Sequence, residues 1–145
     1  MNKKLLLILP LVICVSACTT MQPSTTTTCM IVTPDGNCGG DKHFPIVTIN
    51  TQAGLVIDRN NVCATPGAKI EFRVVPPGQN EPGSVSIRAK NPVDTWLNGT
   101  NSADEKEITI LVPDWVESSD TGVDYNYAIY TAGGVCMDPR VEVRN

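Results

Sequence analysis

The 145-residue sequence is poor in the residues that catalytic and metal sites require. It contains a single histidine, His43, and no closely spaced C-x-x-C pair, so no zinc site of the usual kind is expected. It also lacks a G-x-S-x-G motif, which together with the single histidine leaves a serine nucleophile without activation. We therefore expect no enzymatic activity, no catalytic residues, no cofactor and no bound metal ion.

Positive charge is scarce as well. The chain has 11 basic and 15 acidic side chains, for a formal net charge of −4. This composition supplies no basic field for phosphate backbones, so nucleic acid is not an expected partner. With 41% hydrophobic and 18% charged residues, the sequence is apolar enough for one globular core and has the length of one domain.

No apolar run is long enough to cross a membrane. The longest covers residues 5–15 and contains Pro10, whereas a spanning helix needs about 20 apolar residues. Lys3 and Lys4 precede it, which is typical of an export signal. A plain secretory signal is one interpretation of residues 1–17.

The four residues Val15-Ser16-Ala17-Cys18 resemble the lipobox of bacterial lipoproteins. The resemblance implies removal of residues 1–17 as a lipoprotein signal peptide and acylation of Cys18, with palmitate or a similar chain, as a lipid anchor in the membrane. Thr19, where retained lipoproteins have aspartate, is similar to the sorting pattern of outer-membrane lipoproteins. Loss of Lys3 and Lys4 would leave nine basic against 15 acidic side chains, a net charge of −6.

Residues 18–42 have the composition of a flexible tether, with four consecutive threonines at 25–28 and no apolar periodicity. From residue 43 to 145 the pattern changes to short alternating runs separated by turn residues, which predicts a β-sandwich. The expected fold is therefore all-β, a single Greek-key sandwich. Its predicted strands are 44–50, 55–57, 61–63, 68–75, 84–89, 95–97, 107–112, 124–131 and 140–144.

Four cysteines are expected in an oxidising compartment once Cys14 leaves with the signal and Cys18 carries lipid. Two disulfides with three alternative connectivities follow from this count. We favour Cys29–Cys38, which closes a local turn, and Cys63–Cys136, which joins the start of the domain to its last hairpin.

The domain also resembles cupredoxins and bacterial immunoglobulin-like domains. The segment Pro66-Gly67-Ala68-Lys69-Ile70-Glu71-Phe72 is similar to their strand-opening pattern, and residues 125–129 and 136–143 resemble the cupredoxin C-terminal region. The resemblance implies a sandwich of one of these two types. It implies no blue-copper site, because Ile129 stands where the copper thiolate would be and residues 130–138 contain no histidine.

These features favour a non-enzymatic accessory or structural module of the bacterial envelope that binds another envelope protein. Trp96 and Trp115, each beside a turn or acidic loop, are the candidate partner-binding residues, and core packing is the alternative for both. Strand addition along an exposed edge such as 44–50 is a further means of binding.

Two other hypotheses remain from the sequence. The first is a periplasmic copper- or redox-handling protein that uses sulfur and imidazole ligands and needs free thiols; its residues are His43, Cys63, Cys136 and Met137. The second is a hydrolase whose acidic site draws carboxylates from separate loops. Its candidates are Asp104, Glu105, Asp114, Glu117, Asp120 and Asp124.

Overall fold

The computed structural model describes residues 28–33, 38, 40–52, 54–75, 84–102 and 105–145. The predicted signal peptide, Cys18 and most of the threonine run lie outside these residues. The described elements are the strands β1 (Met30–Ile31), β2 (Ile46–Asn50), β3 (Val56–Ile57), β4 (Asn61–Ala64), β5 (Lys69–Val75), β6 (Val85–Ala89), β7 (Gly99–Thr100), β8 (Glu107–Leu111), β9 (Val123–Thr131), β10 (Cys136–Asp138) and β11 (Arg140–Val143), with a short 3-10 helix η1 (Thr95–Leu97).

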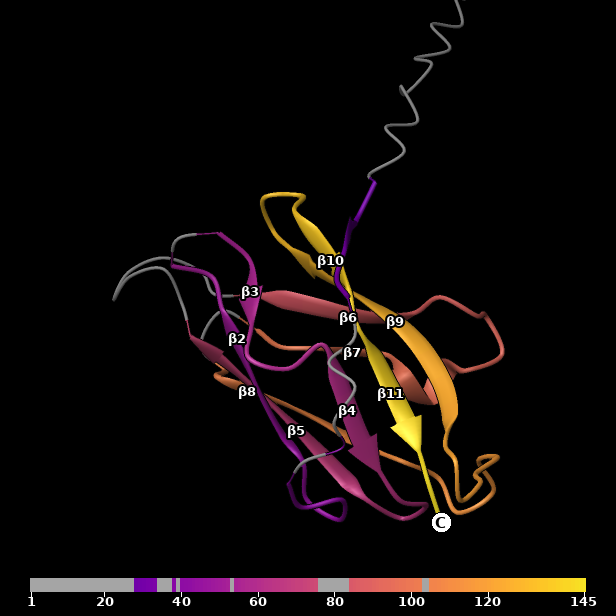
Figure 1. The fold of residues 1–145 in the computed structure, drawn as a ribbon. Coiled ribbons are helices and arrows are strands. Elements are labelled where there is room, and N and C mark those ends of the chain that lie inside the picture. Colours follow the sequence, from indigo (N-terminus) through magenta and orange to yellow (C-terminus); the bar gives the residue numbers. More distant parts are fainter. Residues whose placement is uncertain (1–27, 34–37, 39, 53, 76–83, 103–104) are drawn as a thin grey trace, which may run out of the picture.

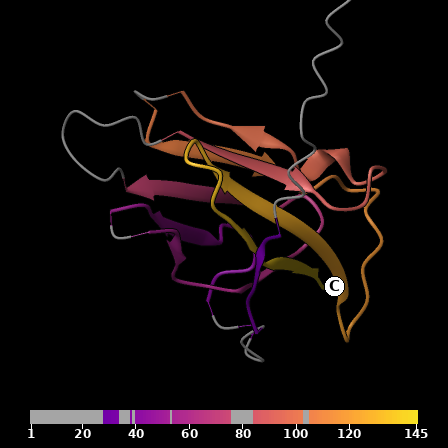
Figure 2. The same cartoon turned by 90° about the horizontal axis from the view of Figure 1, so that it is seen from above.

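Two β-sheets pack face to face and form the body of the domain. The larger sheet has the order β1-β10-β9-β11-β4, and β6 and β7 extend it on the other side of β9. The smaller sheet has the order β3-β2-β5-β8. Figure 1 shows β2, β5 and β8 on the left and β9 and β11 on the right, and the view from above shows the same layers (Figure 2). The predicted all-β sandwich is confirmed.

Both sheets are mixed, because each contains a parallel pair of strands. β2 runs parallel to β5 in the smaller sheet, and β4 runs parallel to β11 in the larger one. An immunoglobulin sandwich is built from two antiparallel sheets. The strand pairing therefore differs from that of a sandwich built from two purely antiparallel sheets.

Alternation along the strands places the core between the sheets. In β5, Ile70, Phe72 and Val74 are buried while Lys69 and Arg73 are exposed, as the period-two pattern predicts. Phe72 meets the fully buried Tyr127 of β9 edge to face, with ring centroids 5.8 Å apart. This contact joins the middle strands of the two sheets.

Parts of the expected tether belong to the folded domain. β1 pairs with β10, so that Met30 lies beside Met137. Further along, the Asn60 side-chain amide donates a hydrogen bond to the Thr33 carbonyl (3.2 Å), and the Thr65 N–H donates to the Lys42 carbonyl (3.1 Å). The folded domain therefore begins before the expected boundary at residue 43.

Three details of the strand prediction need correction. Residues 95–97, expected as a strand, form η1, because the N–H groups of Leu97 and Asn98 bond back to carbonyls three residues earlier. The strand 44–50, offered as an exposed edge, is covered in part, since β3 pairs with β2 at Ile49 and Asn50. β1, β7 and β10 are strands that the sequence did not predict.

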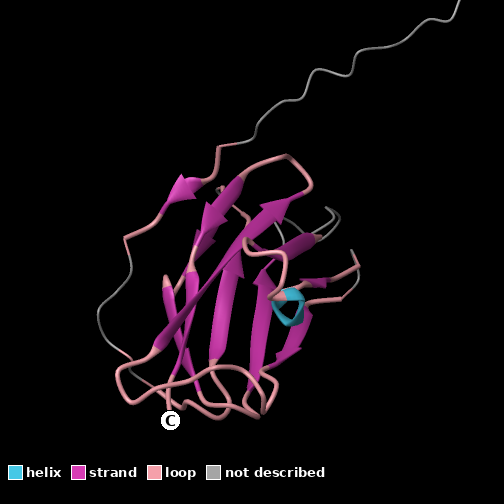
Figure 3. Ribbon diagram, turned by 90° about the vertical axis from the view of Figure 1, so that its right-hand side faces the viewer, coloured by secondary structure: helices cyan, strands magenta, loops and turns pink. Residues whose placement is uncertain are grey.

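The strands connect two distinct ends of the sandwich. β9 spans nine residues, from Val123 at one end to Thr131 at the other, which corresponds to about 30 Å. The hairpin end contains the turn between β9 and β10. The C-terminal end contains the loop of residues 112–122 and the chain terminus, and Figure 3 shows loops gathered there.

The buried hydroxyl of Tyr127 provides a test of the core. Its oxygen has no hydrogen-bond partner among the described residues, and burial raises the pKa of the phenol. Because a buried unpaired hydroxyl costs free energy, Tyr127→Phe should unfold at a temperature equal to or up to about 5 °C above that of the parent.

The matched control is Tyr125→Phe, which removes a hydroxyl that donates to the Glu117 carbonyl (2.9 Å). This variant should lose about 1 kcal/mol of unfolding free energy. Calorimetry would contradict the description of Tyr127 if its variant lost as much as the Tyr125 variant.

Candidate functional site

All four cysteines predicted to be oxidised form disulfides, but the favoured pairing is wrong. The bonds are Cys29–Cys136 and Cys38–Cys63, with Cα–Cα distances of 4.7 and 5.3 Å. The reason is that β1 pairs with β10, which brings Cys29 beside Cys136, while Cys38 lies beside Cys63 of β4. Closeness in sequence was therefore a poor guide to closeness in space.

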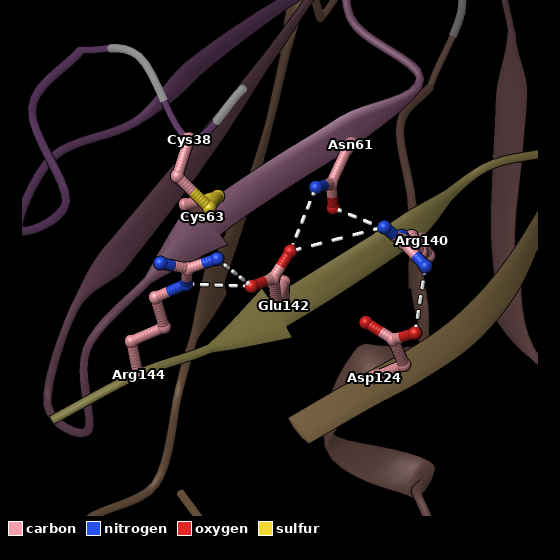
Figure 4. The surroundings of a disulfide bond; sticks show 7 residues. All are labelled: Cys38, Asn61, Cys63, Asp124, Arg140, Glu142 and Arg144. Atoms are coloured by element: carbon pink, nitrogen blue, oxygen red, sulfur yellow. Dashed lines mark hydrogen bonds and ion pairs between the residues drawn. A yellow bond between two sulfur atoms is a disulfide. The ribbon is translucent and has the colours of Figure 1, made fainter. Parts of the chain in front are cut away.

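A buried carboxylate lies on the outer face of the larger sheet beside the Cys38–Cys63 bond (Figure 4). Glu142 of β11 is only 6% exposed and accepts hydrogen bonds from Asn61 Nδ2 (2.8 Å) and Arg144 Nε (2.5 Å). Arg140 lies 3.8 Å from the same carboxylate, and its other terminal nitrogen pairs with Asp124 (2.7 Å). The group links β4, β9 and β11.

Electrostatics keep Glu142 charged in spite of its burial. Burial alone raises its pKa, but the hydrogen bonds from Asn61 and Arg144, with the charges of Arg144 and Arg140, bring the net pKa below its ordinary value. Gly122 has a φ of +95°, and a Cβ there would lie 2.6 Å from Glu142 Cγ, so the site requires glycine. This network was not identified from the sequence, because its members are brought together only by strand pairing.

The network offers donor atoms but no free metal site. The sulfurs of Cys38 and Cys63 and a Glu142 carboxylate oxygen lie within 4.8 Å of one another. Both sulfurs are in the disulfide, and the carboxylate is already bonded to Asn61 and the arginines. We therefore assign the group a structural role between the N-terminal segment and the sheet.

The two candidate tryptophans differ in exposure. Trp96, in η1, is half-buried and packs edge-on against Tyr125, with ring centroids 5.3 Å apart. Trp115 lies in the loop after β8 and is 76% exposed. Trp96 therefore packs against the core, and Trp115 is the one of the two tryptophans that is accessible to a partner.

The loop that carries Trp115 is held firmly on both sides of the tryptophan. Val116, the next residue, is buried, and its N–H donates to the Pro113 carbonyl (3.1 Å). A buried neighbour forces the Trp115 side chain to the outside of the turn. The exposed indole is thus placed on a fixed backbone.

Further hydrogen bonds attach the rest of this loop to the sandwich. The Tyr125 hydroxyl donates to the Glu117 carbonyl, and the Asn145 N–H donates to the Ser119 carbonyl (3.2 Å). The Ser118 hydroxyl donates to the Asn145 side chain (2.6 Å). Trp96 also contributes to this arrangement, because it packs against Tyr125, whose hydroxyl donates to the Glu117 carbonyl.

The residues of the copper and redox hypothesis do not converge. His43 precedes β2 at the C-terminal end, where its Nδ1 lies 3.1 Å from the Thr65 hydroxyl. Cys136 and Met137 lie in β10 at the hairpin end. Cys63 and Cys136 belong to different disulfides, whereas that hypothesis needs free thiols.

The acidic candidates are also dispersed. Asp104 lies outside the described residues, and the Glu105 carboxylate accepts a hydrogen bond from the Ser102 N–H (3.0 Å). Asp124 is paired with Arg140, while Asp114, Glu117 and Asp120 are exposed on the 112–122 loop. None of them lines the depressions beside Arg88 or Asp138 in the described structure.

No protein-family model matches the chain, and no curated protein matches it significantly. Among the described residues, none of the helical segments has the length and apolarity needed to cross a bilayer.

Glu142→Gln tests the buried network. Because the folded pKa is lowered, this carboxylate stabilises the fold above the usual glutamate range, and the stabilisation is lost as the pH falls through the folded pKa. The variant should lose about 2–3 kcal/mol of unfolding free energy near neutral pH. Its unfolding free energy should also fall less steeply than that of the parent as the pH decreases.

Urea unfolding across the acid range would measure both effects. Glu107→Gln, at an exposed position of β8, is the control. It should leave the dependence of the unfolding free energy on pH unchanged. An identical acid profile for the parent and Glu142→Gln would contradict the assignment.

Proposed function

We propose that this protein is a non-enzymatic lipoprotein of the bacterial envelope, anchored to the outer membrane through Cys18, that binds another envelope protein through the loop of residues 113–122. The observation that carries the proposal is Trp115, an exposed indole on a loop fixed to the sandwich by its neighbours. A tryptophan buries about 150–250 Å² on docking and is enriched among the residues that dominate binding energy. A fixed loop also reduces the entropy lost on binding.

The position of the loop fits a tethered binding module. Cys29, close to the proposed anchor in sequence, is bonded to Cys136 at the hairpin end. The loop with Trp115 lies at the C-terminal end, about 30 Å away along β9. The Cys29–Cys136 bond and the Trp115 loop therefore lie at opposite ends of the described domain, an arrangement that would direct the loop away from a membrane to which the N-terminus is anchored.

Charge on the loop indicates the kind of partner surface. Asp114, Glu117 and Asp120 are exposed around Trp115, and none of them has an ion pair among the described residues. A complementary partner would offer an apolar pocket for the indole with a rim of lysine or arginine. Such a rim would mainly accelerate association and set orientation.

A crosslinking experiment tests the binding loop. A photo-crosslinking amino acid at the exposed position 117 should capture one discrete protein in intact cells, and Trp115→Ala in the same chain should abolish that capture. The substitution should change the unfolding free energy by less than about 0.5 kcal/mol, because the side chain is exposed.

Val93 is the matched control, since it is 72% exposed on a different loop. A crosslinker at position 93 should not capture the same protein, and Val93→Ala should leave capture at position 117 unchanged. Equal capture from both positions, or unchanged capture in Trp115→Ala, would overturn the role of the loop.

Acylation is tested separately. Intact-mass measurement of the membrane-extracted protein should find an N-terminal Cys18 carrying acyl chains, and Cys18→Ser should release the protein into the soluble periplasmic fraction, because the substitution removes the acylated residue. Cleavage at another residue, or membrane association that persists in Cys18→Ser, would contradict the anchor without bearing on Trp115.

A further inference from the structure

An arginine on the outer face of the larger sheet is the centre of a second candidate site. Arg88 of β6 is exposed, and its guanidinium carbon lies 5.6 Å from the ring centre of Tyr130 on β9. This cation–π contact restricts the arginine side chain to a position over the sheet. The described residues give Arg88 no hydrogen bond or ion pair that would neutralise it.

Two shallow depressions border this guanidinium. One, of about 380 Å³, lies toward β7 and is lined in part by Asn98 and Thr100. The other, of about 250 Å³, lies toward β9 and is lined in part by Ser86 and Tyr130. Arg88 lines both, so a ligand in either depression would contact it.

Hydrogen-bond donors surround the arginine. Ser86 pairs with Thr100 on one side and with Tyr130 on the other, so three hydroxyl-bearing residues form one row across the sheet. The Asn98 side-chain oxygen accepts from the Ala89 N–H (2.8 Å), which leaves its amide nitrogen to donate. Each of these groups can donate to an anionic oxygen.

Carboxylates are missing from both linings in a chain that is acidic overall. The next acidic residue along the Arg88 row is Asp138, beyond Ala128, and its carboxylate is paired with Lys90 (2.5 Å). The local charge around Arg88 is therefore that of one guanidinium without a counter-ion in the described structure. An anionic ligand would supply that counter-ion.

We propose that Arg88, with Ser86 and Tyr130, binds the carboxylate group of a ligand. A planar guanidinium matches a carboxylate through two parallel N–H···O bonds. A singly charged carboxylate suits one guanidinium in a chain of negative net charge better than a doubly charged phosphate does. The site lies on the sheet face, away from the Trp115 loop, and does not depend on the proposed function.

The test is an NMR titration of the protein as the cell processes it, purified in a neutral detergent. The probes are acetate and two blocked peptides, N-acetyl-Gly-Glu-Gly-amide and its Gln counterpart, at ionic strength matched with chloride. The Arg88 side-chain N–H signal and the backbone amides of Ser86 and Tyr130 should shift with acetate and the Glu peptide, and should not shift with the Gln peptide or chloride.

The variants separate charge from geometry. Arg88→Ala should abolish the shifts of residues 86 and 130, and Arg88→Lys, which keeps the charge but not the planar fork, should weaken binding about tenfold. Arg73→Ala removes an exposed arginine of the smaller sheet and should leave binding unchanged. Arg88→Lys also covers the case in which the alanine variant does not fold.

Each outcome decides a point. Tighter binding of the Glu peptide than of acetate identifies a peptide carboxylate as the source, and equal binding identifies a small free acid. Stronger competition by inorganic phosphate, equal shifts with chloride, or unchanged binding in Arg88→Lys would overturn the proposal.

Discussion

The apolar layer between the two sheets is the constraint on which the rest of the structure depends. Phe72 and Tyr127 meet in its middle, and the alternating strands on either side direct every second side chain into it. A slip of one residue in any strand would exchange its buried and exposed sets, so the layer also fixes strand register. Register in turn decides which polar residues become neighbours on the outer faces, including those around Glu142 and Arg88.

The packed sheets also position the Trp115 loop and the two disulfides. Tyr125 lies at the border of the core, and its hydroxyl holds the loop that exposes Trp115. The C-terminal residue Asn145 holds the same loop from the other side, because β11 ends beside it. The Cys29–Cys136 bond attaches the N-terminal segment to β10 at the opposite end, and the Cys38–Cys63 bond attaches it to β4 beside Glu142. Rigid presentation of a loop at one end and attachment of the chain near the other are both consequences of the same sandwich.

Local patterns allowed most strands to be predicted, and the failures share a cause. The pattern around Phe72 was predicted correctly because alternation is a property of neighbouring residues. Thr95–Leu97 was misassigned because a β-branched, an aromatic and an aliphatic residue in succession fit a short strand as well as a 3-10 turn. β1 and β10 have three residues or fewer and are defined by their partners. Exposure of Trp115 and half-burial of Trp96 depended on how each loop folds back on the sheets, which composition does not encode.

The sequence by itself determined the all-β class, the positions of the alternating strands, and the participation of four cysteines in disulfides, because these depend on residue type, spacing and count. Only the tertiary structure decided the pairing Cys29–Cys136 and Cys38–Cys63, because a disulfide forms between cysteines whose Cα atoms approach within about 7 Å, whatever their separation along the chain. The Glu142 network and the acid-free surroundings of Arg88 were decided in the same way. Their members come from strands distant in sequence, and hydrogen bonding between those strands places them side by side.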